Sequence, residues 1–265
     1  MLRKVTLLAA ALVLVGGPAF AAGKAKEPAD IAFSFEGPFG TYDQAQLQRG
    51  YKVYREVCAA CHSMNLLAFR NLGDRGGPFY DPKYPNANDN PYVKAIAAEA
   101  QIDDLDGETG DPVKRPGIPA DRFPAPFPNT IAAKASNGGA LPPDLSLIAK
   151  AREGGPEYVA ALLQGYKTPP KGHEPASATL HYNEYFPGNF LAMAAPLAAG
   201  KVEFDDGTKS TLKQQSEDVA AFLMWAAEPK MEERKQMGAA VMVFLVLFAG
   251  LLYASYRRVW ANESH

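Results

Sequence analysis

The chain has 265 residues, of which 47% are hydrophobic and 21% charged, with 27 basic residues against 29 acidic ones. A chain of this length and apolar content can bury a sizeable core, which excludes a disordered polymer. The 22 prolines and 23 glycines indicate that much of the chain is loop, and this suits a domain folded around a cofactor better than one built on a regular sheet.

The N-terminal residues have the pattern of a secretory signal. Arg3 and Lys4 precede a mostly apolar run at residues 5–15, and residues 19–21 fit an A-x-A cleavage site. A membrane anchor is the weaker interpretation, because the apolar run is short and is interrupted by glycine and proline. We therefore expect residues 1–21 to be removed and the rest of the chain to be exported.

A predicted helix follows a lead-in rich in glycine, proline and charge. Thr41 and Gln44 fit an S/T-x-x-E/Q capping box, and apolar residues recur at helical spacing from Leu47 to Cys58. Gly50, in mid-helix, costs roughly 1 kcal/mol relative to alanine. Either another helix crosses close to the backbone at this point or the glycine is simply tolerated, and the sequence leaves both open.

The residues from Cys58 to His62 have the C-x-x-C-H spacing of a c-type haem attachment site. Two thiols at this spacing reach the two vinyl groups of one porphyrin edge, and the adjacent histidine falls under the iron as proximal ligand. Cys58 and Cys61 are the only cysteines in the chain, which excludes a four-cysteine zinc or iron–sulfur site. The motif therefore predicts one covalently attached haem c, and it agrees with export.

Between the motif and residue 140, glycine, proline, asparagine and aspartate predict mainly loop, with a short helix at residues 92–100. Six acidic residues lie here with no basic residue among them: Glu99, Asp103, Asp104, Asp106, Glu108 and Asp111. Such a run is most often a solvated loop. The functional interpretation is a mobile acidic flap that raises the encounter rate with a basic partner by long-range attraction.

The charge of the exported part bears on this choice. Without the two basic residues of the leader, and without the five basic and three acidic residues of 230–265, the domain has 20 basic against 26 acidic residues. This excess disfavours nucleic acid as a ligand, because nucleic-acid binders need a basic face. It favours a cationic protein partner.

The iron needs a sixth ligand or an open position. Met64 is too close to His62 in sequence to reach the opposite face, and most other methionines lie in or beside predicted helices. Met193 lies in a proline-bounded apolar loop that can press a thioether onto a haem face, although a buried methionine is more often simple packing. His181 is the alternative and would give a bis-histidine centre of lower potential.

Two helices are predicted near the C-terminus. Thr211 and Gln214 repeat the capping box, and the apolar spacing that follows marks an amphipathic helix ending near Glu228, the natural partner of the helix that contains Gly50. Residues 237–256 carry no charge and form about 30 Å of helix, enough to span a bilayer. We expect them to anchor an exported domain, with the C-terminus in the cytoplasm.

Several longer blocks carry a resemblance. The first runs from Gly50 into the haem motif, and the others are Arg115-Pro116-Gly117, Ala140-Leu141-Pro142-Pro143-Asp144-Leu145-Ser146, Tyr182-Asn183-Glu184-Tyr185-Phe186-Pro187-Gly188 and Trp225-Ala226-Ala227-Glu228-Pro229. In their residues and in their order along the chain, these blocks resemble the cytochrome c1 family. Its members are the haem c subunits of ubiquinol–cytochrome c oxidoreductase (the cytochrome bc complex).

The resemblance implies a set of site residues. Cys58 and Cys61 would hold the haem, with His62 and Met193 as its axial ligands. A further set would line the haem pocket, with the first three near the propionates and the last packed on the ring: Asn137, Arg152, Tyr158 and Pro143. A partly buried propionate needs cationic or hydrogen-bonding partners, which an arginine and a tyrosine supply.

The resemblance also implies a fold and a role. The fold would be mainly α with long loops: a cytochrome c-type haem domain at residues 22–229, then a transmembrane helix and short cytoplasmic tail at 230–265. The domain would face the periplasm from a bacterial inner membrane. Electrons would arrive from a Rieske-type iron–sulfur subunit beside cytochrome b and leave to a soluble cytochrome c, so the chain alone would not be an enzyme. A free-standing membrane-anchored shuttle and an open-site haem enzyme remain as alternatives.

Overall fold

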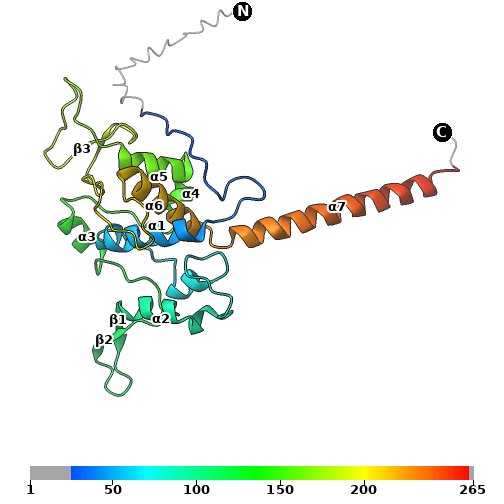
Figure 1. The fold of residues 1–265 in the computed structure, drawn as a ribbon, viewed down its shortest axis with the longest axis horizontal. Coiled ribbons are helices and arrows are strands. Elements are labelled where there is room, and N and C mark those ends of the chain that lie inside the picture. Colours follow the sequence, from blue (N-terminus) through cyan, green and yellow to red (C-terminus); the bar gives the residue numbers. More distant parts are fainter. Residues whose placement is uncertain (1–24, 263–265) are drawn as a thin grey trace, which may run out of the picture.

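The computed structural model describes residues 25–262, so the predicted leader at residues 1–21 lies outside the described part. The fold is mainly helical with long loops, as predicted, and carries two small antiparallel hairpins (Figure 1). The elements in chain order are α1 (Gln44–Glu56), η1 (Cys58–Ala60), η2 (Phe69–Gly73), η3 (Ala87–Asp89), α2 (Pro91–Ala98), β1 (Gln101–Leu105), β2 (Pro112–Pro116), α3 (Thr130–Ser136), α4 (Ile148–Ala151), α5 (Gly155–Gln164), β3 (His181–Tyr182), β4 (Phe190–Leu191), α6 (Leu212–Ala227) and α7 (Met231–Val259).

The core forms where α1 and α5 pack on α6, with the short α4 beside them (Figure 1). Phe222 is fully buried at its centre, and its ring contacts Tyr51, Tyr54 and Trp225 at centroid distances of 5.5–5.7 Å. These residues recur on one face of each helix because of the 3.6-residue period, so burying them joins the two helices. The core thus holds the C-terminal end of α1 in place, next to the haem motif.

Gly50 is the point of closest approach between α1 and α6. A Cβ atom at this position would lie 2.0 Å from the Asp218 carbonyl oxygen and 2.7 Å from Cβ of Phe222. No side chain fits at such distances, so only glycine allows the two backbones to cross here. The crossing helix considered from the sequence is confirmed, and its partner is the predicted C-terminal helix.

The two predicted capping boxes have different outcomes. Thr211 is the N-cap of α6, and its hydroxyl accepts from the Gln214 amide at 3.0 Å. The predicted start of α1 at Thr41 is wrong, because the N-cap is Asp43, whose carboxylate accepts from the amides of Ala45 and Gln46. A carboxylate at a helix N-terminus also interacts favourably with the helix dipole, an advantage that a hydroxyl lacks.

The acidic run is a hairpin rather than the predicted loop. β1 pairs with β2 antiparallel, and Asp103 lies opposite Lys114 in the register. Lys114 contacts Asp103 at 2.9 Å, and Arg115 contacts Asp104 at 2.5 Å and Asp121 at 2.6 Å. These cross-strand pairs order a segment whose composition alone indicates loop. The short helix expected before it is confirmed as α2.

The predicted transmembrane segment lies within α7, which projects from the domain as a single long helix (Figure 1). Among residues 25–262, this is the one helix that is long and apolar enough to cross a membrane. Its apolar side chains are exposed from Met237 onward, whereas Met231 in its first turn is buried against the domain. The helix is therefore seated in the domain at one end and free to face lipid along the rest.

Candidate haem site

The C-x-x-C-H segment forms a tight turn at the end of α1. The amides of Cys61 and His62 both donate to the Cys58 carbonyl, at 3.1 and 2.9 Å, across the 3-10 turn η1. Cys58 is half-buried, Cys61 is exposed, and both are free thiols. Because one short turn fixes both thiols and the imidazole, their relative positions are set by the backbone before any cofactor is bound.

His62 is oriented by a bond on one side of its ring. Its Nδ1 lies 2.8 Å from the Pro143 carbonyl oxygen, so Nδ1 carries the proton and Nε2 keeps its lone pair for a metal. Burial is the main cause that lowers the pKa of His62, and the ring is therefore neutral at pH 7. A neutral imidazole with a free Nε2 is the form that ligates iron.

Asp144 holds the Pro143 segment against the turn. Its carboxylate accepts from the Ser63 hydroxyl and the Asn65 amide, each at 2.8 Å, and from the Ser146 amide at 2.8 Å. These bonds lower the pKa of Asp144 although burial opposes them. The segment that supplies the carbonyl to His62 is thus fixed by three groups, which hold Pro143 beside the imidazole.

Met193 lies in the loop that follows β4. It is half-buried and packs on the same core as Cys58, and its carbonyl oxygen accepts from the Tyr166 hydroxyl at 3.0 Å. The loop is shaped upstream by Asn189, which adopts a positive φ of 63°, and by the pairing of β3 with β4. Tyr166 therefore ties the methionine loop to the end of α5.

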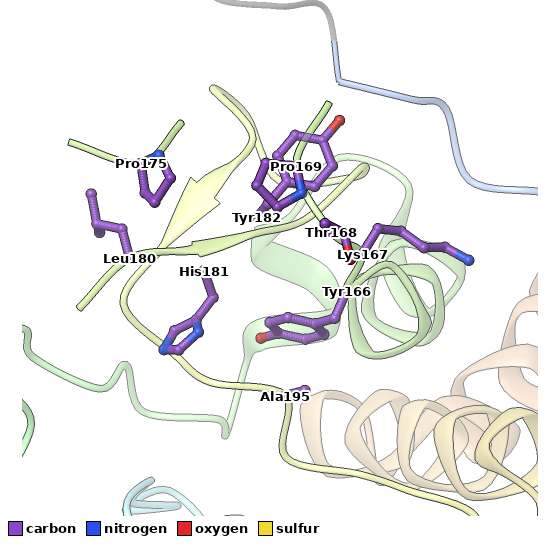
Figure 2. Close-up of a pocket in the computed structure, with 9 residues that line it drawn as sticks. All are labelled: Tyr166, Lys167, Thr168, Pro169, Pro175, Leu180, His181, Tyr182 and Ala195. Atoms are coloured by element: carbon purple, nitrogen blue, oxygen red, sulfur yellow. The ribbon is translucent and has the colours of Figure 1, made fainter. Parts of the chain in front are cut away.

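A pocket of about 640 Å³ opens beside this loop. Figure 2 shows the side chains of His181 and Tyr166 directed toward the same space, with Ala195 next to them. Ala195 is two residues after Met193, so the pocket borders the methionine loop. His181 thus lies near the methionine loop and stays the alternative axial ligand.

Arg152 and Tyr158 lie near each other on this side of the domain. Burial raises the pKa of the Tyr158 hydroxyl, and the Arg152 charge partly opposes that rise. Burial likewise raises the pKa of the Tyr166 hydroxyl, with a smaller contribution from Tyr158. The place of Arg152 and Tyr158 beside the propionates stays a prediction.

Asn137 behaves differently. It ends α3, and its side-chain amide donates to the Ala133 carbonyl at 2.7 Å within the same helix. This bond explains a local capping role and gives no separate support for a place beside a propionate.

Two residues of the site have no role in the sequence-based prediction. Asp144 directly follows Pro143 in one of the blocks that carry the resemblance, so its place in the sequence was the available signal. Tyr166 follows α5 without a motif, and only the three-dimensional contact with Met193 reveals it.

The donors that the structure assembles fit a haem c. They are two unpaired thiols on one turn, a neutral imidazole whose Nε2 is free, and a half-buried thioether on a separate loop. Thiols that add to vinyl groups and an imidazole–thioether pair are the groups such a haem uses. With the helical fold and the membrane-length helix, this site defines the class of membrane-anchored c-type cytochromes.

Comparison with known proteins gives the particular family. The model of the Cytochrome C1 family matches residues 33–263. Cytochrome c1 of Rhodospirillum rubrum is 41% identical over 279 residues, covering 99% of this chain and 98% of that protein. A mitochondrial cytochrome c1-2 heme protein of Solanum tuberosum is 47% identical over 223 residues, covering 84% and 81%. The chain belongs to the cytochrome c1 family.

One relative is longer than this chain. The protein named cytochrome b/c1 of Bradyrhizobium diazoefficiens is 47% identical over 256 residues, which is 89% of this chain and 36% of that protein. The chain therefore spans about a third of this relative and nearly all of the Rhodospirillum one.

Proposed function

We propose that this chain carries one covalently attached haem c and passes single electrons from a Rieske-type iron–sulfur protein to a soluble c-type cytochrome. Membership in the cytochrome c1 family supports the role of a haem electron-transfer subunit in a cytochrome bc1 complex. The observation that carries the proposal is the C-x-x-C-H turn whose histidine donates through Nδ1 to Pro143 and keeps Nε2 free.

The residues of the chain divide the work of holding the cofactor. Cys58 and Cys61 would attach the porphyrin, and His62 through Nε2 and Met193 through its sulfur would hold the iron. The haem supplies a one-electron couple between ferric and ferrous iron, and a methionine ligand raises its potential. Pro143 and Asp144 keep the imidazole oriented, while Tyr166 keeps the methionine loop in place. No bond of a substrate is made or broken on this chain, so it is a redox subunit and not an enzyme by itself.

Arg152 and Tyr158 are the proposed partners of the haem propionates. Arg152 is exposed and Tyr158 half-buried, so a carboxylate between them would be partly desolvated and would receive charge-assisted hydrogen bonds. Asn137 is kept as a third candidate from the family resemblance alone.

The proposed surroundings follow from the anchor and the family. Residues 22–229 form a periplasmic domain, and α7 holds it on a bacterial inner membrane by a single pass. Cytochrome b and the iron–sulfur protein are the proposed fixed partners, and the name cytochrome b/c1 of one relative supports the first of them. The acceptor docks transiently, and transient redox interfaces bury less than about 1,200 Å².

Purification of the full chain from membranes in mild detergent tests the proposal. We expect a haem c spectrum, a mass increase of one haem that survives denaturation, and co-purification with cytochrome b and an iron–sulfur protein. Loss of haem on denaturation would contradict covalent attachment. Purification without those partners would favour the free-standing shuttle, and ready carbon monoxide binding by the reduced native protein would favour the open-site enzyme.

A further inference from the structure

The loop at residues 36–40 is bound to α7 where that helix leaves the domain. The Lys235 ammonium donates to the carbonyl oxygens of Phe35 and Gly40, at 2.6 and 2.9 Å. Tyr42, just beyond the loop, donates its amide to the Glu232 carboxylate at 2.9 Å. Figure 1 shows this segment, in blue before α1, looping out beside the first turns of α7. The loop therefore keeps a fixed height relative to the helix.

The ends of the loop are buried and its tip is not. Phe35 stacks on Phe33 at a centroid distance of 4.9 Å and contacts Tyr42 at 5.2 Å, and all three are buried. The Thr41 amide closes the loop on the Ser34 carbonyl at 3.1 Å. Phe39 in contrast is 88% exposed. A single exposed apolar ring is ordinary on a protein surface, so a partner is indicated only by where the ordered loop lies relative to α7.

The position of the Phe39 loop along the axis of α7 identifies that partner. Lys235 lies two residues before Met237, the first residue of the charge-free stretch. At a rise of about 1.5 Å per residue, the backbone of Lys235 lies about 3 Å before the apolar part of the helix begins, and its ammonium binds the carbonyls of the loop. Phe39 precedes Gly40, whose carbonyl binds Lys235, so the loop lies near the level where α7 would pass from water into lipid, where aromatic side chains gather in membrane proteins.

We propose that loop 36–40 is a second, non-spanning contact with the bilayer, in which Phe39 enters the lipid interface and Lys235 holds the loop at that depth. The occupant of this surface is the lipid beside α7. Two contacts on one side of the domain, a spanning helix and an inserted ring, resist tilting of the domain where one helix would act as a pivot. The inference depends on α7 spanning a membrane and not on the identity of the cofactor.

Spin labels in vesicles test the proposal. The full chain with Phe39→Cys is labelled with a nitroxide and reconstituted into phosphatidylcholine and phosphatidylglycerol vesicles, and collisions with oxygen and with a water-soluble nickel chelate are measured. Ile131→Cys, at an exposed apolar residue of α3, is the matched control in water, and Val246→Cys on α7 is the control in lipid. The parent chain, treated identically, supplies the background from Cys58 and Cys61.

We expect the label at position 39 to collide with the nickel chelate several-fold less often than the label at 131, while staying open to oxygen. Adding Lys235→Gln should restore most of the chelate collisions at 39 and leave those at 246 unchanged. Chelate collisions at 39 equal to those at 131 would overturn the proposal. So would a label at 39 shielded from both reagents only when cytochrome b is present, because the occupant would then be protein. A label at 246 open to the chelate would refute the membrane span itself.

Discussion

At the residue scale, the fold depends on a buried ion pair that ties α1 to α6. Arg49 Nε and Nη2 contact the two carboxylate oxygens of Asp218 at 2.7 and 3.3 Å, and Nη1 reaches Asp206 at 2.7 Å. The Asp218 side chain is fully buried and that of Arg49 is 15% exposed. Burial raises the pKa of Asp218, and Arg49 opposes this rise. The pair therefore stabilises the fold only while both partners are present.

Replacing one partner should be costly. Arg49→Met leaves the Asp218 carboxyl buried without its main partner, which raises its pKa further, and we expect the free energy of unfolding to fall by about 3–5 kcal/mol. Adding Asp218→Asn to this variant should recover most of the loss, because an amide costs less to bury than a carboxylate. Urea titration followed by haem absorbance measures both. A single variant as stable as the parent would show that the pair contributes nothing.

Single residues differ in how far the sequence predicts them. Cys58, Cys61 and His62 were predicted from the C-x-x-C-H spacing alone, because covalent attachment of a haem would need that spacing whatever the fold around it. Met193 was reached from its proline-bounded apolar loop, with His181 as the alternative, whereas the pocket residues needed the family resemblance. All of these roles stay predictions. The Arg49–Asp218 pair lies 169 positions apart, and Tyr166 meets Met193 across a loop. Neither contact has a local signature, so only the three-dimensional fold reveals them.

At the element scale, the crossing of α1 and α6 sets the position of the haem motif. Gly50→Ala would place a Cβ against the Asp218 carbonyl, which is backbone and cannot turn away. We expect a loss of roughly 1–3 kcal/mol or more in the free energy of unfolding, the range for overpacked cores.

Gly107→Ala is the matched control for this change. Nothing lies within 4 Å of a Cβ at Gly107, in the turn of the acidic hairpin, and its φ is not positive, so its effect should stay within about 0.5 kcal/mol. Equal losses in the two variants, measured by the same urea titration, would contradict the proposed close crossing.

The acidic hairpin makes a kinetic prediction. Asp103 and Asp104 are paired with basic residues, so the attraction for a basic partner would come chiefly from the turn, where Glu108 and Asp111 are exposed. Glu108→Gln with Asp111→Asn should lower the rate of oxidation by a basic cytochrome c several-fold at low salt, with the difference vanishing at high salt. Stopped-flow absorbance measures the rate.

The control for the hairpin variant is Glu203→Gln, which removes an exposed charge elsewhere on the domain. The oxidation rate of Glu203→Gln by the basic cytochrome c should differ from the parent rate only by the small amount that one unit of net charge produces. A parent rate that ignored ionic strength would reject electrostatic steering and leave the hairpin as a solvated surface feature.

Elements were predictable where local and tertiary forces agree. The cap of α6 and the span of α7 follow from local signals that packing does not oppose. The start of α1 was misplaced because two polar residues compete for the cap and the carboxylate of Asp43 takes it. The hairpin was missed because charged side chains, rather than alternating apolar ones, pair its strands. Composition cannot distinguish such a hairpin from a loop.

At the scale of the whole molecule, the chain couples a haem domain to a membrane helix through a short, ordered junction. Glu228 contacts both Lys150 of α4 and Arg234 of α7, while Met231 is buried under the domain. A carrier that diffused freely would not need such a junction. It suits a domain that must present its haem repeatedly to a neighbour in the same membrane, which is the role proposed above.

The account as a whole depends on a closed iron centre, and Met193→Leu in the purified full chain tests it most directly. We predict that the near-infrared thioether-to-ferric band disappears, that the midpoint potential falls and that the reduced protein begins to bind carbon monoxide, while His181→Leu leaves all three unchanged. If Met193→Leu left the band and the midpoint potential unchanged, or if His181→Leu produced these changes instead, Met193 would not be the sixth ligand and the centre would not be the proposed histidine–methionine relay.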